Sequence, residues 1–349
     1  MPSAASAAGI MLAAFLASAM LSFAALRYAR WRQLLDLPGQ RRSHVTPTPR
    51  GGGIAIVVTL LLALPFLEWG NVRLPLVVAL ALAAVAGIGW VDDHRPLSAR
   101  SRLAVHGLAA LALVTVLLLA FGNPVPWSPL MLTGVLAVIW LAGCVNAWNF
   151  MDGSNGLVTS QCLWLGVAMS CVFVHLGSAG AVGAWPWAGV ALVLVAGCAG
   201  FLPFNFPRAV IFLGDVGSGA LGLVCGLLLA VMFWLDPRCF WLMVLLPSAL
   251  LVDAGMTLLW RMLSGRRWYT AHREHLYQWL IRSGCSHADV AMLYMAWNLV
   301  VVAPACFAIM RWPAAEVPLT LVVLLLAAAL WWFGKSALRN RARRQGSFQ

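Results

Sequence analysis

Eleven apolar stretches, separated by short polar segments, follow one another along this chain. Each comes close to the roughly 20 mainly apolar residues that a helix needs to cross a bilayer. The pattern predicts an all-α polytopic membrane protein of about eleven transmembrane helices, folded as a single domain over residues 1–349. The predicted spans are 4–26, 52–70, 72–91, 103–121, 130–147, 157–176, 181–204, 213–234, 239–260, 290–310 and 316–334.

The composition supports this class of protein. Hydrophobic residues make up 62% of the chain and charged residues 10%, whereas a soluble domain has roughly 45–50% and about 25%. The eight cysteines form no C-x-x-C pair, and most lie in apolar stretches. We interpret them as small buried residues rather than as zinc ligands or a disulfide framework.

Positive charge is distributed unevenly between the predicted spans. The first apolar stretch is followed, not preceded, by arginines at Arg27 and Arg30, which is the reverse of a cleaved signal peptide and indicates a retained span. With the N-terminus outside, 20 of the 23 Lys and Arg residues fall in inner segments, as the positive-inside rule requires. We therefore expect a periplasmic N-terminus, a cytoplasmic C-terminus and a basic, solvated tail over 335–349 that also meets lipid headgroups. The net charge of +12 then reflects topology, and no nucleic-acid partner is expected.

The inner segments also carry most of the polar residues, so we expect the chemistry on the cytoplasmic face. The apolar run that ends at residue 91 leads directly into Asp92 and Asp93. Adjacent carboxylates raise each other's pKa unless a cation lies between them, and a divalent metal is the simplest such cation. The alternative is a solvated loop start that pairs with Arg95 or Arg100.

A second polar motif places Asn146, Asn149, Asp152 and Asn155 at intervals of three residues. On a helix this spacing keeps the side chains on one side. They would form one wall of a cavity whose amide and carboxylate groups suit a sugar, a phosphate or a metal. The alternative is a polar turn between two spans.

A third motif, residues 212–219, opens an apolar span with Gly214, Asp215 and Gly217. A helix N-terminus rich in glycine exposes backbone N–H groups, which suit a phosphate. Asp215 could cap this helix, or it could hold a metal that bridges to the phosphate.

Two further inner segments and one buried acid complete the candidate chemistry. His272 and His275 lie in the longest inner segment, where they could contact a pyrophosphate or move a proton. The segment 41–53 combines basic residues, including Arg50, with prolines and three glycines, and could bind an anion or simply obey the positive-inside rule. Asp253 lies within an apolar stretch and needs a partner, either in the site or on another helix.

Together these motifs resemble those of the polyprenyl-phosphate N-acetylhexosamine-1-phosphate transferases, a membrane superfamily within glycosyltransferase family 4. The resemblance extends over about residues 36–290, and the loop sequences are most similar to the O-antigen-initiating subgroup. It implies transfer of a sugar phosphate from a UDP-N-acetylhexosamine to undecaprenyl phosphate, with release of UMP. It also implies an enzyme of the bacterial inner membrane that needs Mg²⁺, with Mn²⁺ as an alternative ion. A homodimer is left open.

The resemblance also implies roles for individual residues. Asp215, with Asn149, would bind the metal, while Asp92 and Asp93 would position it or deprotonate the lipid phosphate. Asp152 would line the nucleotide-sugar cavity, and His275 would contact the diphosphate or the sugar. Further substrate contacts would come from Asn146, Asn149, Asn155, Arg50, Arg102, His272, Gly214 and Gly217.

Two alternatives are retained. A phospho-N-acetylmuramoyl-pentapeptide transferase of peptidoglycan synthesis would be favoured by consecutive histidines in the last inner segment, which this sequence lacks. A secondary transporter would place polar groups near the middle of the membrane and would show repeat symmetry. Here the polar residues gather at one face instead, and no repeat is evident.

Overall fold

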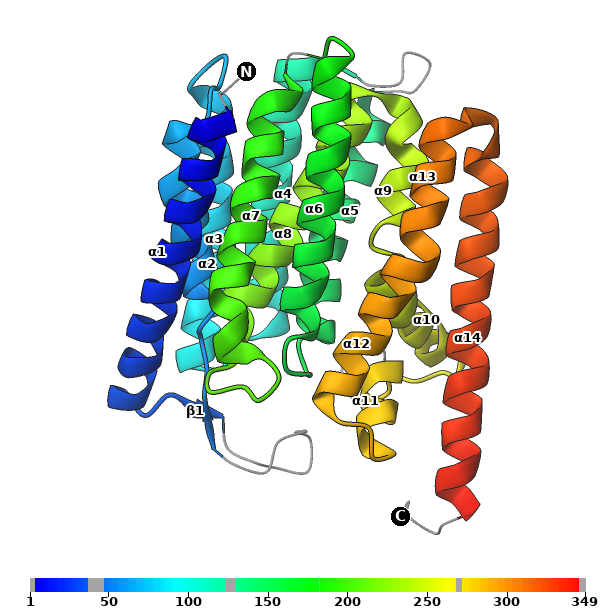
Figure 1. Cartoon of the computed structure of the whole chain (residues 1–349). Helices are drawn as coiled ribbons and strands as arrows, with labels where there is room; N and C mark the ends of the chain where they lie inside the picture. The colour runs from blue at the N-terminus through cyan, green and yellow to red at the C-terminus, as the bar shows by residue number, and fades with distance from the viewer. Residues whose placement is uncertain (1–3, 37–46, 124–129, 182, 268–271, 345–349) are drawn as a thin grey trace.

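A computed structural model describes residues 4–36, 47–123, 130–181, 183–267 and 272–344. The chain forms a bundle of helices that run roughly along one axis, with the N-terminal helix starting at one end and the last helix finishing at the other (Figure 1). The elements are α1 Ala4–Trp31, β1 Leu35–Asp36, β2 Thr48–Pro49, α2 Ile54–Ala63, α3 Arg73–His94, α4 Ala99–Phe121, α5 Leu130–Met151, α6 Leu157–Ser178, α7 Ala184–Asn205, α8 Gly214–Leu235, α9 Phe240–Leu245, α10 Ser248–Leu263, α11 Leu276–Arg282, α12 His287–Trp297, α13 Ala303–Arg311 and α14 Glu316–Arg344.

The prediction of an all-α polytopic membrane protein is confirmed. Within the described residues, nine helices are long and apolar enough to cross a membrane. The predicted span 239–260 is not one straight helix, because α9 and α10 meet at an angle of 72°. Pro247 lies at this break, and proline removes a helical N–H donor and clashes with the preceding turn. The predicted span 52–70 is also shorter than expected: α2 ends at Ala63 and a 3₁₀ turn over Leu64–Phe66 follows.

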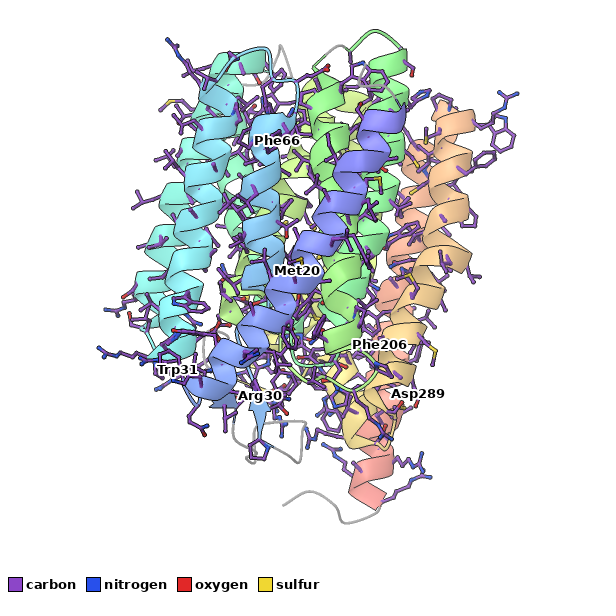
Figure 2. The ribbon with its side chains drawn as sticks, turned by 60° about the vertical axis from the view of Figure 1, so that its left-hand side comes forward. Met20, Arg30, Trp31, Phe66, Phe206 and Asp289 are labelled. Atoms are coloured by element: carbon purple, nitrogen blue, oxygen red, sulfur yellow. The ribbon has the colours of Figure 1, made fainter. Side chains whose placement is uncertain are left out.

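Helix α8 is the centre of the bundle. Of its most apolar window, 94% is buried inside the protein, against 22% for the last span. Its glycines permit this close packing, since a Cβ on Gly222 would lie 2.6 Å from the carbonyl oxygen of Cys144 on α5. Large apolar side chains such as Met20 and Phe66 point away from the bundle instead (Figure 2). This outer apolar surface is what a bilayer requires.

The inner segments predicted from charge lie at one end of the bundle. Figure 2 shows Arg30, Trp31, Phe206 and Asp289 there, although they belong to different parts of the chain. A short antiparallel pair, in which Leu35 faces Pro49, crosses the same end and leads into the glycine-rich loop. Which membrane face this end meets stays a prediction.

Two helices extend further than the sequence suggested. The acidic pair Asp92 and Asp93, which follows the predicted span 72–91, belongs to the last turn of α3, and the alternative of a solvated loop start is not observed. Residues 335–344, expected as a solvated tail, continue α14 as a helix, and Lys335 is buried within it. Residues 41–46 of the basic loop and 345–349 of the tail lie outside the described residues.

Candidate active site

Asp93 of α3 holds the start of α8. Its carboxylate accepts hydrogen bonds from the backbone N–H of Asp215 at 3.2 Å and of Val216 at 3.1 Å. A carboxylate at this position satisfies the free N–H groups of the helix N-terminus and favours its dipole. The helix end that the sequence suggested for a phosphate is therefore already occupied by Asp93. The sequence also suggested that Asp215 caps this helix, but its side chain does not do so.

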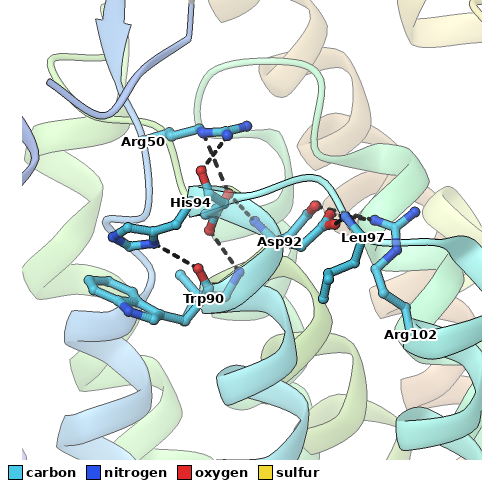
Figure 3. A network of polar contacts seen from close by, with 9 residues as sticks. Arg50, Trp90, Asp92, His94, Leu97 and Arg102 are labelled. Atoms are coloured by element: carbon cyan, nitrogen blue, oxygen red, sulfur yellow. Dashed lines mark hydrogen bonds and ion pairs between the residues drawn. The ribbon is translucent and has the colours of Figure 1, made fainter.

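The neighbouring residue Asp92 faces a different partner. Its Oδ2 accepts a hydrogen bond from Nη1 of Arg102 at 2.8 Å, and its Oδ1 accepts one from the backbone N–H of Leu97 (Figure 3). The same Arg102 nitrogen lies 3.3 Å from Oδ2 of Asp215. Arg102 thus bridges Asp92 and Asp215, so the cation expected beside the acidic pair is, in this structure, a guanidinium. The proposed alternative partners Arg95 and Arg100 do not take this place.

Arg50 and the glycines after it pack against the start of α8. The Arg50 side chain donates to the backbone carbonyl of Asp93, and its Nε lies 3.9 Å from Oδ1 of the same residue (Figure 3). The following loop runs alongside the chain before α8, where the Gly53 N–H donates to Leu213 at 2.8 Å. A Cβ on Gly53 would lie 2.3 Å from Cα of Gly217. Gly217 therefore serves backbone packing, and Gly214 alone of the two predicted glycines lines the cavity described next.

A polar cavity of about 260 Å³ opens at this end of the bundle. It brings together residues from the acidic pair, the second motif, the start of α8, the basic loop and the segment before α12. Its lining residues are Asp36, Arg50, Asp93, Asp152, Gly153, Ser154, Asn155, Asn205, Phe212, Gly214, Asp215, Gln278 and His287. Six of the site residues predicted from the sequence thus meet around one space: Arg50, Asp93, Asp152, Asn155, Gly214 and Asp215.

Asp152 has the most unusual electrostatic environment of the cavity residues outside the spans. Burial, and then the carboxylates of Asp215 and Asp93, raise its pKa well above the usual range, while the Gly214 backbone N–H lowers it. Like charges in a confined site disfavour ionisation. A cation or a protonated ligand in the cavity would relieve this repulsion.

The second motif is only partly helical. Asn146 and Asn149 lie on α5, which ends at Met151, so Asp152 and Asn155 belong to the turn that follows. Asn146 donates to the Ala142 carbonyl of its own helix at 2.7 Å, and Asn149 accepts from Ser218 on α8. The wall predicted from a spacing of three is therefore divided: Asp152 and Asn155 line the cavity, whereas Asn146 and Asn149 lie outside its lining.

The two histidines of the longest predicted inner segment, His272 and His275, pack near Phe150 and lie outside the cavity lining. His275 is 2% exposed and stacks near Phe150 and Tyr277, and the His272 ring is centred 4.9 Å from it. Burial, followed by the proximity of His275, lowers the pKa of His272 to about 4. Burial also lowers the pKa of His275. Burial thus disfavours the charged form of both rings, and neither ring lines the cavity. Their contacts with substrate stay a prediction.

His287 and Gln278 occupy the place that the pair was expected to fill. His287 Nδ1 lies 3.0 Å from Ser154 Oγ and 3.3 Å from the Asn155 backbone nitrogen, so it fixes the turn after α5. His287 was not among the residues predicted from the sequence. A usable signal was present, because Ser286 and Asp289 form a capping box that marks the start of a long apolar helix at the cavity end of the bundle.

Asp253 acts as a junction between helices. Its carboxylate accepts from the backbone N–H of Leu276 at 2.7 Å, from the Tyr294 hydroxyl at 2.7 Å and from Nε1 of Trp331 at 2.9 Å. These partners belong to α11, α12 and α14. The sequence left open whether the partner of Asp253 lies in the site or on another helix, and the structure shows hydrogen bonds to other helices. The bond to Leu276 also holds α11 in position, and Gln278 of α11 lines the cavity.

The cavity's donor chemistry suits a hard cation. Within the described residues, no three His, Cys, Asp or Glu side chains already form a metal-ligand cluster. The acidic groups at the cavity, Asp152 and Asp215 among them, offer oxygen donors, the type that Mg²⁺ prefers. Burial, and then the Asp215 and Asp93 carboxylates, raise the pKa of Asp152, so a cation bound here would favour its ionised form. Asn149, expected as a further ligand, is already bonded to Ser218 and fits less well.

Comparison with known proteins adds an independent line of evidence. The model of glycosyl transferase family 4 matches residues 75–233. A decaprenyl-phosphate N-acetylglucosaminephosphotransferase of Mycobacterium leprae is 33% identical over 76% of this chain and 74% of its own length. An undecaprenyl-phosphate alpha-N-acetylglucosaminyl 1-phosphate transferase of Thermotoga maritima is 33% identical over 56% of each chain. A phospho-N-acetylmuramoyl-pentapeptide-transferase of Moorella thermoacetica is 33% identical over 54% of this chain and 63% of its own.

Proposed function

The chain belongs to glycosyl transferase family 4, and from this membership we propose that it transfers an N-acetylhexosamine-1-phosphate from a UDP-sugar to undecaprenyl phosphate. The observation that carries the proposal is the cavity in which Asp152, Asp215 and Arg50 meet at one end of an apolar helical bundle. A lipid acceptor can reach such a site from the bilayer, while a nucleotide-sugar can reach it from water. The product would start an O-antigen or a related polysaccharide at the cytoplasmic face of a bacterial inner membrane.

In the proposed reaction, a phosphate oxygen of the lipid bonds to the β-phosphorus of the UDP-sugar. The bond from that phosphorus to the oxygen bridging to the α-phosphorus breaks, and UMP leaves with the bond's electron pair. Phosphoryl transfer depends mainly on positioning and on stabilising the charge of the transferred group. Arg50, at the cavity wall, would stabilise phosphate oxygens, and Asp93 would act by keeping the start of α8 in place.

Asp215 and Asp152 would hold Mg²⁺, or Mn²⁺ as an alternative, and the ion would neutralise phosphate charge when bound. Arg102 would keep the Asp215 carboxylate directed toward the cavity through their 3.3 Å contact. Asp92 would hold Arg102 from the other side at 2.8 Å. In this arrangement Asp92 positions the site through Arg102, and Asp152 serves as the second carboxylate ligand of the ion.

The experiment offers the purified protein undecaprenyl phosphate with a panel of UDP-N-acetylhexosamines, and identifies the lipid product by mass. UMP release that needs Mg²⁺, together with a lipid-pyrophosphoryl-sugar product, would support the proposal. Asp215→Asn should abolish this release, whereas Arg73→Ala, at the start of α3 and the opposite end of the bundle, should not. Turnover of UDP-N-acetylmuramoyl-pentapeptide alone would favour the peptidoglycan reaction, and full activity in Asp215→Asn would remove the metal assignment.

A further inference from the structure

A second cavity, lined mainly by charged residues, lies beside α11. It has a volume of about 310 Å³ and is formed by α11, the C-terminal part of α14 and the segment between α10 and α11. We call it the basic pocket, and its lining residues are Arg266, Glu274, Trp279, Arg282, Lys335, Arg339 and Arg343. Five of these side chains are cationic and one is acidic. The basic pocket therefore carries a strong excess of positive charge.

Lys335 gives the basic pocket its most specific feature. The residue is 4% exposed, and within the described part of the chain its Nζ has no hydrogen-bond partner. The ammonium lies 4.3 Å from the centre of the Trp331 ring, a cation–π contact that leaves its donors unused. Buried charges are normally paired and hydrogen-bonded, because their desolvation is costly. Lys335 thus presents an unused cationic donor in the lining of the basic pocket.

The carboxylates near Lys335 are engaged elsewhere. Glu274 bonds to Arg261 and lies 3.0 Å from Nη1 of Arg266. Asp253 accepts hydrogen bonds from three other helices, as described above. Neither carboxylate forms a hydrogen bond with Lys335, so each compensates its charge only at longer range, whereas an anion in the basic pocket would bond to the ammonium directly.

An apolar groove adjoins the basic pocket. It has a volume of about 470 Å³ and runs between α10, α12 and α14, with Leu280, Leu330 and Gly334 among its lining residues. The polar groups on its wall are satisfied internally; Ser248, for example, accepts from Nε1 of Trp297 at 3.2 Å. Gly334 immediately precedes Lys335, and α11 and α14 contribute to both spaces. An apolar chain in the groove would therefore bring its charged end to Lys335.

We propose that the basic pocket and the apolar groove together bind one anionic phospholipid of the surrounding bilayer. Its phosphate would contact Lys335 and Arg339, and an acyl chain would lie along α14 in the groove. A soluble anion would use the charge but not the adjoining apolar surface, which is why a lipid fits better. The bound lipid would brace α11, the helix that carries Gln278 into the candidate active site.

The test titrates the full-length protein in detergent with phosphatidylglycerol, phosphatidylcholine or inorganic phosphate and counts bound molecules by native mass spectrometry. Lys335→Met removes the buried charge while retaining an apolar side chain. Arg339→Ala provides an independent change in the basic pocket. Arg341→Ala, on the same helix but outside the lining residues, is the matched control.

We expect tight binding of one phosphatidylglycerol that Lys335→Met and Arg339→Ala each weaken about fivefold, since one basic residue near a lipid surface contributes about 1 kcal/mol. Arg341→Ala should bind as the wild type does. Equal binding by the wild type and Lys335→Met, or equal binding of phosphatidylcholine, would overturn the proposal. Displacement of the lipid by inorganic phosphate would overturn the lipid assignment. A Lys335→Met variant with a raised KM for undecaprenyl phosphate and unchanged phospholipid binding would also overturn the lipid assignment.

Discussion

Asp93 and Val216 are 123 residues apart, yet the carboxylate of Asp93 accepts the backbone N–H of Val216 at 3.1 Å. Together with the bond from the Asp215 N–H, this contact fixes the end of α3 against the start of α8. Asp215 is carried by the same turn, so its direction depends on Asp93. The two acidic residues therefore have different roles. Asp93 caps the start of α8, and Asp92 binds Arg102.

The first prediction concerns this cap. Asp93→Ala leaves two buried N–H groups without an acceptor, each of which costs roughly 1–3 kcal/mol. We expect a marked drop in the unfolding temperature of the detergent-purified protein, together with loss of activity. Glu68→Ala removes an exposed carboxylate and should change the unfolding temperature little. An Asp93→Ala protein as stable as the wild type would contradict the capping role.

The second prediction concerns the bridge at Arg102. Arg102→Lys keeps the charge but replaces a planar fork with a point charge, so it cannot hold Asp92 and Asp215 in the same way. Loss of one charged hydrogen bond of about 1.5–3 kcal/mol should lower kcat by about tenfold or more. Arg100→Lys is the matched control, because Arg100 is exposed on the same helix. Equal kcat values for the two variants would show that the bridge does not matter.

Much of this architecture can be predicted from the sequence, because membrane helices depend on long apolar runs that need no partner to be recognised. The break at Pro247 and the short α2 are harder, since both depend on how neighbouring helices fill the bundle. The site is harder still. The sequence shows that Asp93 lies beside Asp92, but only the packing of α3 on α8 separates their roles.

The histidines illustrate the same limit. His272 and His275 stand out as a close pair in the longest inner segment, yet they pack against Phe150 behind the cavity. His287 reaches the cavity because α12 begins there and directs its first residue toward Ser154. Side-chain direction at a helix start depends on the tertiary path of the chain, which spacing alone does not reveal.

The third prediction uses the raised pKa of Asp152. A carboxyl whose pKa is higher in the folded than in the unfolded protein destabilises the fold as pH rises from its ordinary value toward the raised one. Without a divalent ion, Asp152→Asn should therefore have a higher unfolding temperature than the wild type, and the difference should grow as pH increases from 5 to 8.

Added Mg²⁺ should reduce that difference by stabilising the ionised carboxylate of the wild type. Asp289→Asn is the control, because hydrogen bonds from Ser286 lower the pKa of that carboxyl below its ordinary value of 3.8, so it stays ionised and its effect on the unfolding temperature should not change between pH 5 and 8. If the difference in unfolding temperature between Asp152→Asn and the wild type did not change with pH, the pKa of Asp152 would not be raised as we expect.

The last prediction concerns the contact between the glycine-rich loop and α8. A Cβ added at Gly53 would lie 2.3 Å from Cα of Gly217, so one of the two backbones must move. Overpacking of this kind costs about 1–3 kcal/mol. It would also displace Asp215, which lies on the turn just before Gly217, so Gly53→Ala should lose activity as well as stability.

Gly87→Ala is the matched control: its Cβ would have nothing within 4 Å, and alanine favours a helix interior by roughly 0.5–1 kcal/mol. Gly87→Ala should accordingly remain active and unfold at the same or a higher temperature, and an active, fully stable Gly53→Ala would show that the loop does not position α8.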